Sequence, residues 1–247
     1  MKIRKQQIFA IWKDAVWRNQ LIIFSFLGML GLQFTFVKTI EASNAVVATL
    51  LQFLAPIFIV CYIAARHKKW PPYKQVIGIV GTLVGLFLLL TNGSISTLLV
   101  SDVALLWGLF LGLTYAFYTL YPARLMAEWG VLLVVAWGML LSGIMLAGIG
   151  QIWKSDDWLL LLQPNIFIMM ASLVILGASA FVLFLSSLKY ISAVETSILS
   201  SFEPLTAMII SVFWFGSVML GWQLFGCVLM LVFVAYLSIA GEKEENI

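Results

Sequence analysis

The feature that most constrains this sequence is an internal repeat inside apolar segments. Four residue identities recur at a constant offset of 148 positions: Ala45 and Ala193, Pro56 and Pro204, Gln75 and Gln223, and Gly78 and Gly226. A membrane protein built from two related halves commonly carries a solute pathway where the repeats meet, and this pathway can open to either side. The repeat therefore predicts transport, and the alternative is a structural duplication without transport.

The composition places the chain in lipid. Of its 247 residues, 63% are hydrophobic and only 10% are charged, with a mean hydropathy of +1.07, whereas about 25% of residues are charged in a soluble domain. Because about 20 helical residues span the hydrocarbon core, the apolar runs predict an all-α polytopic membrane protein with eight transmembrane helices. These helices span residues 21–38, 44–65, 74–90, 102–121, 130–150, 166–188, 193–215 and 221–240.

The basic residues orient the predicted helices. Of the 14 Lys and Arg residues, only Lys38 and Lys154 fall on one side of the membrane. Cytoplasmic loops carry an excess of Lys and Arg, so both termini are predicted to be cytoplasmic in a multi-pass protein of the cell membrane. The first helix of the early repeat then runs outward and its counterpart runs inward, which makes the repeats inverted.

The predicted symmetry is incomplete. Residues 21–91 form a first repeat of three helices, and residues 102–240 form a second repeat of five. We therefore expect an incomplete 3+5 version of a 5+5 helix bundle that lacks the first two helices, followed by a cytoplasmic tail at 241–247. The cytoplasmic basic segment 1–20 is either a former loop or an interfacial amphipathic anchor, since Trp with basic residues suits the headgroup zone.

Three segments carry a resemblance to a known family. Residues 44–56 read NAVVATLLQFLAP, their echo at 192–204 ends in Phe-Glu-Pro, and residues 115–118 read Tyr-Ala-Phe-Tyr. In these segments the chain resembles the EamA family of the drug/metabolite transporter superfamily. The resemblance implies two five-helix inverted repeats, of which this chain matches the last eight helices, and export or import of small metabolites such as amino acids. The chain departs from the family pattern in loops 66–69 and 216–219, which lack an acidic residue.

Glu203 is the first candidate for a pathway residue. An ionisable side chain at the bilayer centre costs at least about 2.5 kcal/mol on insertion scales and normally faces protein or water. Glu203 directly precedes Pro204, which lacks an amide hydrogen and frees a backbone carbonyl one turn earlier. The carboxyl group is suited to binding a cationic group or carrying a proton. The alternative is a protonated structural residue bonded to Ser200 or to a neighbouring helix.

Polar residues near the two prolines extend this predicted pathway. Gln52 and Ser200 each lie four positions before the proline of their repeat, and Thr49 and Ser197 lie three positions earlier still, on nearly the same faces. Such side chains either face a cavity or satisfy freed carbonyls and neighbouring helices.

Three residues on other helices are further candidates. Gln33 stands among apolar neighbours and points either toward substrate or into a helix contact. Tyr115 and Tyr118 lie on one helix face and offer aromatic surface and hydroxyl groups, including cation–π contact with an ammonium group. Packing is the alternative role for both tyrosines.

Two small-residue patterns predict close approach of helices. Gly81 and Gly85 form one GxxxG pattern, and Gly108 and Gly112 form a second. Such patterns serve internal packing or dimerisation equally well. The family resemblance favours internal packing, and a homodimer stays open.

The sequence offers little to an enzyme. It has a single histidine, two isolated cysteines and no phosphate-binding loop. We therefore expect no catalytic residue, cofactor, metal site, nucleic-acid partner or ATP hydrolysis. The predicted function is alternating-access transport of a small organic metabolite through the lipid bilayer, with proton or ion coupling as an energy source. The alternatives are a truncated inactive relative, or a membrane enzyme or assembly factor that reuses the bundle.

Overall fold

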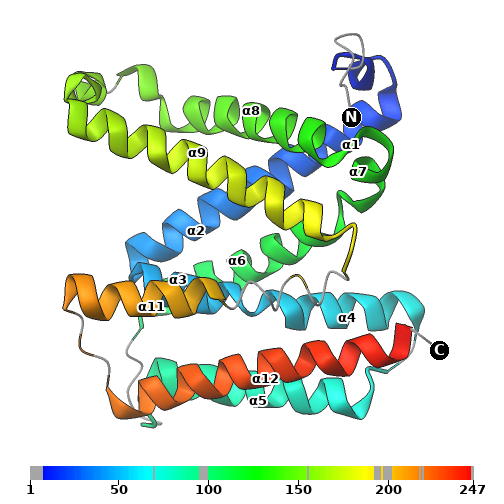
Figure 1. Ribbon diagram of the computed structural model, residues 1–247, viewed down its shortest axis with the longest axis vertical. Helices are drawn as coiled ribbons and strands as arrows, with labels where there is room; N and C mark the ends of the chain where they lie inside the picture. Colours follow the sequence, from blue (N-terminus) through cyan, green and yellow to red (C-terminus); the bar gives the residue numbers. More distant parts are fainter. Residues whose placement is uncertain are drawn as a thin grey trace. The chain divides into compact units, whose positions relative to one another are not determined.

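The computed structural model contains helices and turns but no β-strand within the residues it describes, which are 8–68, 70–94, 100–154, 156–191, 196, 202–216, 218 and 220–245 (Figure 1). This organisation confirms the all-α class. The elements are η2 (Ala10–Trp12), α1 (Ala15–Ile23), η3 (Phe24–Leu30), α2 (Gly31–Ala42), α3 (Ala45–Gln52), α4 (Ala55–His67), α5 (Tyr73–Thr91), α6 (Asp102–Leu120), α7 (Ala123–Trp129), α8 (Val131–Gly150), η4 (Ile152–Lys154), η5 (Asp156–Leu162), α9 (Pro164–Ser187), α11 (Phe202–Phe215) and α12 (Gly221–Glu245).

Five helical stretches are long and apolar enough to cross a membrane. Two shorter apolar stretches follow the same pattern in α5 and α12. These lengths support a membrane protein, whereas the total of eight spans and their inverted arrangement stay predictions. The five stretches are Ala15–Ala42, Val47–His67, Asp102–Trp129, Val131–Gly150 and Pro164–Ser187.

The first helix begins before the apolar run that predicted it. The predicted span starts at residue 21, but α1 starts at Ala15. The reason is a polar cap: the Asp14 carboxylate accepts hydrogen bonds from the amides of Val16 at 2.8 Å and Trp17 at 3.4 Å. These bonds satisfy amides that have no partner inside the helix. Hydropathy alone could not place this start, because the residues that determine it are polar.

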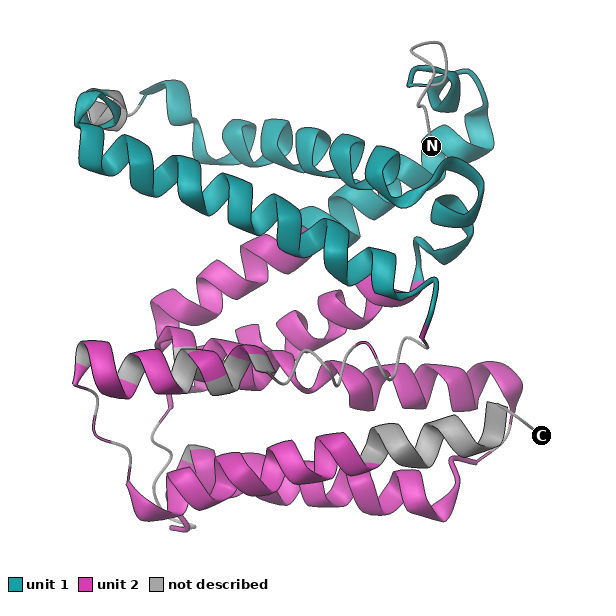
Figure 2. Ribbon diagram, viewed as in Figure 1, with its two compact units in different colours: residues 1–30, 121–190 teal, residues 31–120, 191–247 magenta. Residues whose placement is uncertain are grey.

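The chain packs into two compact units (Figure 2). Unit 1 contains residues 1–30 and 121–190, and unit 2 contains residues 31–120 and 191–247. Each unit combines parts of both sequence repeats, so tertiary packing and sequence similarity divide the chain differently. The repeat boundaries therefore stay a prediction from the sequence.

Unit 1 is built around α8. The π-helical segment η3 and helix α1 pack against it. Gly138 of α8 leaves room for Phe24 and Met29, whose side chains are fully buried. The indole N–H of Trp137 donates to the carbonyl of Ile8 at 3.0 Å, which ties the N-terminal segment to α8. In contrast, most side chains of the apolar helix α9 are exposed or half-buried, as expected of a helix that faces lipid, and Leu185 near its C-terminal end is buried.

In unit 2, α6 packs against α2, α3 and α4. Its two spaced glycines allow this approach. A Cβ atom on Gly108 would lie 2.8 Å from Cβ of Leu51, and one on Gly112 would lie 2.9 Å from Cβ of Leu54. Both distances are below ordinary contact, so a larger residue would push the helices apart. The predicted close approach at this glycine pair is confirmed.

The second pairing in unit 2 joins α5 to α12, which run side by side and antiparallel (Figure 1). Gly85 of α5 crosses Gly226 of α12: a Cβ on Gly85 would lie 2.8 Å from the Gly226 carbonyl oxygen, and one on Gly226 would lie 2.6 Å from the Gly85 oxygen. Gly81 lies against the ring of Phe233. The second predicted glycine pair thus also serves packing within the chain.

Candidate functional site

The candidate site lies where the second predicted span breaks into two helices. The predicted span 44–65 is observed as α3 and α4, separated by a turn at Phe53 and Leu54. The amides of these two residues bond to carbonyls three positions earlier, at 3.0 and 3.1 Å. Pro56 is the second residue of α4 and has no amide hydrogen to donate to the carbonyl of Gln52. The break therefore puts Gln52 at the end of α3.

Gln52 and Glu203 meet at this break. The Gln52 amide Nε2 donates to Oε2 of Glu203 at 3.1 Å. Gln52 is buried, with 6% of its surface exposed, whereas Glu203 is exposed. Glu203 stands in the first turn of α11, which packs against α3 within unit 2. An acidic group is favourable there, because the N-terminus of a helix carries a partial positive charge.

The Glu203 carboxylate has a neutral partner rather than a cationic one. Within the residues that the structure describes, the one ion pair joins Lys38 to Glu41 at 2.6 Å. Glu203 accepts its hydrogen bond from an uncharged amide. A carboxylate without a paired cation is suited to accept a charge-assisted hydrogen bond from a cationic ligand.

Asn44 positions the helix that presents Gln52. Its side-chain oxygen accepts a hydrogen bond from the Val47 amide at 3.0 Å and caps the N-terminus of α3. We expect Asn44→Ala to lower the free energy of unfolding by about 1 kcal/mol, because loss of an N-cap exposes an unpaired amide. The apparent melting temperature of the purified protein measures this loss. Asn44→Ser retains a capping oxygen and is expected to behave like the wild type. Equal stability of the Ala variant would contradict the capping role.

The remaining candidates near the prolines are less completely defined. Thr49 lies on α3, one turn before Gln52, and is 4% exposed. Pro204 lies in the first turn of α11, where only its backbone is described. Ser197 and Ser200 lie outside the described residues.

The candidates on other helices are mostly buried. Tyr115 and Tyr118 of α6 are 7% and 1% exposed, and their ring centroids lie 6.2 Å apart. Gln33 of α2 is half-buried. Within the described residues, no hydrogen bond joins any of these three side chains to the Gln52–Glu203 pair. Among the candidates that the structure describes, Gln52 and Glu203 are in direct contact, and the two tyrosines lie against each other.

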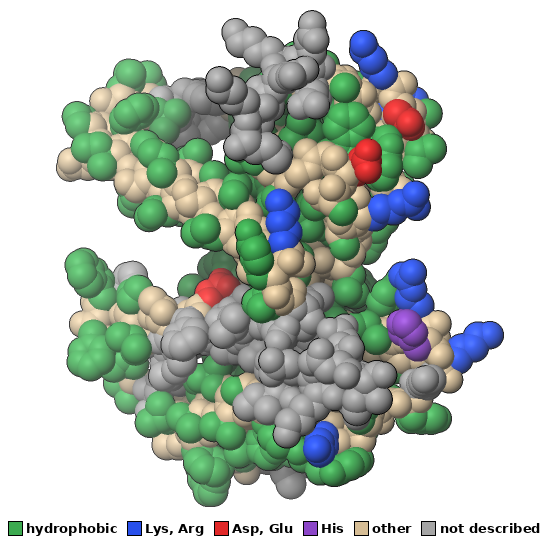
Figure 3. Space-filling view, turned by 45° about the vertical axis from the view of Figure 1, so that its right-hand side comes forward, with side chains coloured by type: hydrophobic (Ala, Val, Ile, Leu, Met, Phe, Trp, Pro, Cys, Tyr) green, Lys and Arg blue, Asp and Glu red, His purple; other side chains and the backbone are tan. Residues whose placement is uncertain are grey.

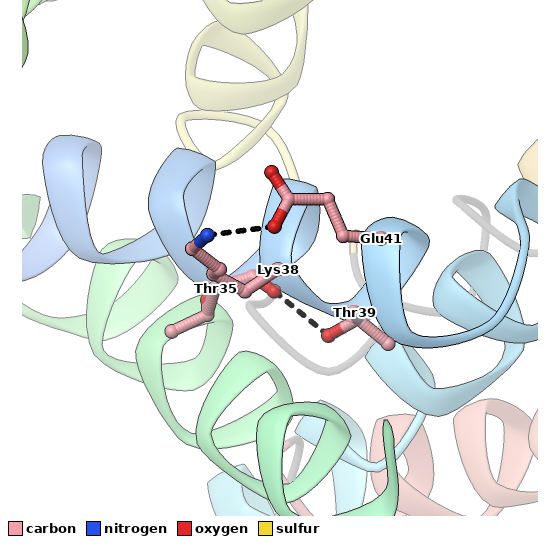
Figure 4. A network of polar contacts seen from close by, with 4 residues as sticks. All are labelled: Thr35, Lys38, Thr39 and Glu41. Atoms are coloured by element: carbon pink, nitrogen blue, oxygen red, sulfur yellow. Dashed lines mark hydrogen bonds and ion pairs between the residues drawn. The ribbon is translucent and has the colours of Figure 1, made fainter. Parts of the chain in front are cut away.

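A hydroxyl contact between α2 and α6 was not predicted from the sequence. Thr35 Oγ1 lies 3.1 Å from Thr114 Oγ1. The Thr39 hydroxyl donates to the Thr35 carbonyl at 2.7 Å (Figure 4). The exposed Lys38–Glu41 pair lies on the same helix. The spacing of Thr35, Thr39 and Ser43 by four residues is the signal that would have identified this polar face.

Comparison with known proteins identifies the family. The profile described as the EamA-like transporter family matches residues 2–91 and 102–239. The chain is also 35% identical over 241 residues to the uncharacterized inner membrane transporter YicL of Salmonella typhimurium, an alignment that covers 97% of this chain and 79% of that protein. No solved structure matches the chain. The resemblance found in the sequence is thus confirmed, and both findings point to a transporter rather than an enzyme. The chain belongs to the EamA-like transporter family, whose members are membrane transporters.

Proposed function

We propose that this transporter carries a small organic solute with a positively charged group, such as an amino acid or another amine, without hydrolysing ATP. The observation that carries the proposal is the 3.1 Å hydrogen bond from Gln52, which is buried, to Glu203. It positions a carboxylate without giving it a counter-charge. An ammonium group of the solute would supply that charge, and the Gln52 amide would orient the carboxylate.

The origin of the two residues supports transport by alternating access. Gln52 comes from the first sequence repeat, four positions before Pro56, and Glu203 comes from the second, directly before Pro204. The 148-residue offset relates these two prolines. In transporters built from inverted repeats, the solute site lies where the repeats meet, and rocking of one half against the other exposes it to each side in turn. We propose this mechanism with both termini in the cytoplasm and a proton or ion gradient as the energy source.

We assign the other candidates to the surroundings of this pair. Thr49 supports Gln52 from one turn away, and Ser197 and Ser200 extend the polar surface on the second repeat. Tyr115 and Tyr118 form an aromatic wall, which suits their burial and mutual packing. Gln33 of α2 contributes a further polar group to the pathway.

Solute flux in proteoliposomes tests the proposal. Purified protein is reconstituted and offered a labelled primary amine, a zwitterionic amino acid or a dicarboxylate. We expect uptake of the amine or the amino acid above that of empty vesicles, and no uptake of the dicarboxylate, because like charge repels it from Glu203. The same solutes are expected to raise the melting temperature, since a ligand that binds only the folded state stabilises it.

Two results would overturn the proposal. The first is uptake at the level of empty vesicles for all three solutes by protein that is shown to be folded. The second is dicarboxylate uptake as fast as that of the amine.

A further inference from the structure

The connection between α4 and α5 is basic and aromatic. Residues 66–74 contain four Lys or Arg residues and one histidine but no acidic residue. Trp70 and Tyr73 are 95% and 70% exposed. Figure 3 shows the histidine of the chain beside blue Lys and Arg side chains. Exposed Trp and Tyr rings favour the boundary between headgroups and acyl chains, so this segment matches the chemistry of a membrane surface.

Arg66 and Lys74, at the two ends of this connection, have local contacts. The Arg66 guanidinium donates to the Tyr62 hydroxyl at 3.2 Å, one turn earlier in α4. The Lys74 ammonium lies 5.9 Å from the centroid of the Tyr73 ring. Among the residues whose side chains the structure describes, no carboxylate forms an ion pair with either cation. Both cations are therefore suited to bind an anionic partner.

An apolar groove begins next to Lys74. It has a volume of about 380 Å³. Val76 lies two positions after Lys74 and Ile77 three positions after it, so Lys74 stands on α5 within one turn of these lining residues. The groove then follows α5 along its contact with α12. Its lining is entirely apolar: Val76, Ile77, Val80, Gly81, Val84, Leu229 and Phe233.

We propose that this connection and groove bind one anionic glycerophospholipid. The headgroup phosphate would lie on Arg66, Lys68 and Lys74, and an acyl chain would fill the groove between α5 and α12. Clusters of basic residues beside a membrane helix attract anionic lipids, and an apolar chain is the complement of the groove lining. In unit 1, by contrast, Lys13 and Arg124 stand close in the sequence to the acidic residues Asp14 and Glu128.

Photocrosslinking from inside the groove tests the site. The photoreactive residue p-benzoylphenylalanine replaces Val80, which is 53% exposed, in the full-length protein. The matched control replaces Leu109 of α6, which is 51% exposed and lies outside the groove. After delipidation, each protein is mixed with phosphatidylglycerol or phosphatidylcholine, and crosslinked lipid is measured by mass spectrometry. We expect the Val80 position to prefer phosphatidylglycerol by about tenfold at low salt, less at high salt, and the Leu109 position to show no preference.

Charge variants distinguish a specific headgroup site from general attraction. The triple variant Arg66→Gln, Lys68→Gln, Lys74→Gln should lose the preference at Val80. The control variant removes the same amount of charge from unit 1 and should retain the lipid preference at Val80. It carries Lys13→Gln, Arg18→Gln and Arg124→Gln. The proposal would be overturned by equal crosslinking of both lipids at Val80, or by a preference at Leu109 as large as that at Val80. Either result would mean that the crosslinks report the lipid that surrounds any membrane protein.

Two further arms exclude other partners for the basic residues. In the first, free glycerol phosphate competes with an equal concentration of phosphatidylglycerol for crosslinking at Val80. Displacement of the lipid would indicate an anion site that needs no acyl chain, which contradicts the proposal that an acyl chain fills the groove. The C-terminal end of α12 carries Glu242, Glu244 and Glu245. In the second, the triple variant of Arg66, Lys68 and Lys74 is melted in lipid-free detergent. A lower melting temperature together with an unchanged lipid preference would indicate that the basic residues pair with these glutamates, and it would contradict the proposed lipid site.

Discussion

Replacement of Glu203 by Gln is expected to reduce amine flux by roughly 10- to 150-fold. The substitution keeps the length of the side chain and an oxygen that accepts from Gln52, but it removes the negative charge. A hydrogen bond to a charged group contributes about 1.5–3 kcal/mol, and every 1.4 kcal/mol is a factor of ten in binding. Initial uptake rates in proteoliposomes, normalised to folded protein, measure the loss.

Two further variants isolate the charge at this site. Glu41→Gln makes the same chemical change at an exposed acid that pairs with Lys38, and we expect it to leave flux unchanged. The double variant Gln52→Glu, Glu203→Gln exchanges the two groups across the 3.1 Å contact and should recover part of the flux. Wild-type flux in the single Glu203 variant would show that this carboxylate does not bind the solute.

The sequence predicted the uninterrupted helices closely. The predicted span 74–90 is observed as α5 (Tyr73–Thr91), and 130–150 is observed as α8 (Val131–Gly150). In both cases residues that disfavour helix flank a continuous apolar run, as Pro72 does directly before α5. Hydropathy and breaker residues are local properties, so they determine these bounds without knowledge of the tertiary structure.

Hydropathy does not resolve interruptions inside an apolar run. The span 44–65 is apolar throughout, yet the helix stops after Gln52 and resumes at Ala55. Pro56 indicates an interruption of the helix, but the turn itself is formed by Phe53 and Leu54. Their amides donate to carbonyls three positions earlier rather than four. Packing of Leu54 against Gly112 of α6 supports this geometry, and such contacts depend on a helix far along the chain.

The candidate site was predictable as residues but not as a contact. Glu203 and Gln52 were each selected for polarity near a proline, and the structure joins them across 151 positions. No helical periodicity relates residues on two different helices. The Thr35–Thr114 contact was missed for a related reason, because Thr in a helix commonly bonds its own backbone and so gives no sign of a partner.

The crossing of α5 and α12 predicts the largest effect on stability. We expect Gly85→Ala to lower the free energy of unfolding by about 1–3 kcal/mol through overpacking. Its added Cβ would lie 2.6 Å from the Met230 amide nitrogen and 2.8 Å from the Gly226 oxygen. Both are backbone atoms, so no change of side-chain rotamer relieves the clash, and the helices must separate. The apparent melting temperature in detergent measures this effect.

A matched substitution separates crowding from helix propensity. Gly177→Ala in α9 adds the same methyl group where no atom lies within 4 Å, and it is expected to be neutral or to stabilise the protein slightly. Gly226→Ala should destabilise the protein like Gly85→Ala. The double variant should cost less than the two single losses together, because one separation of the helices accommodates both methyl groups. If Gly85→Ala melts at the same temperature as Gly177→Ala, α5 and α12 do not cross at these glycines.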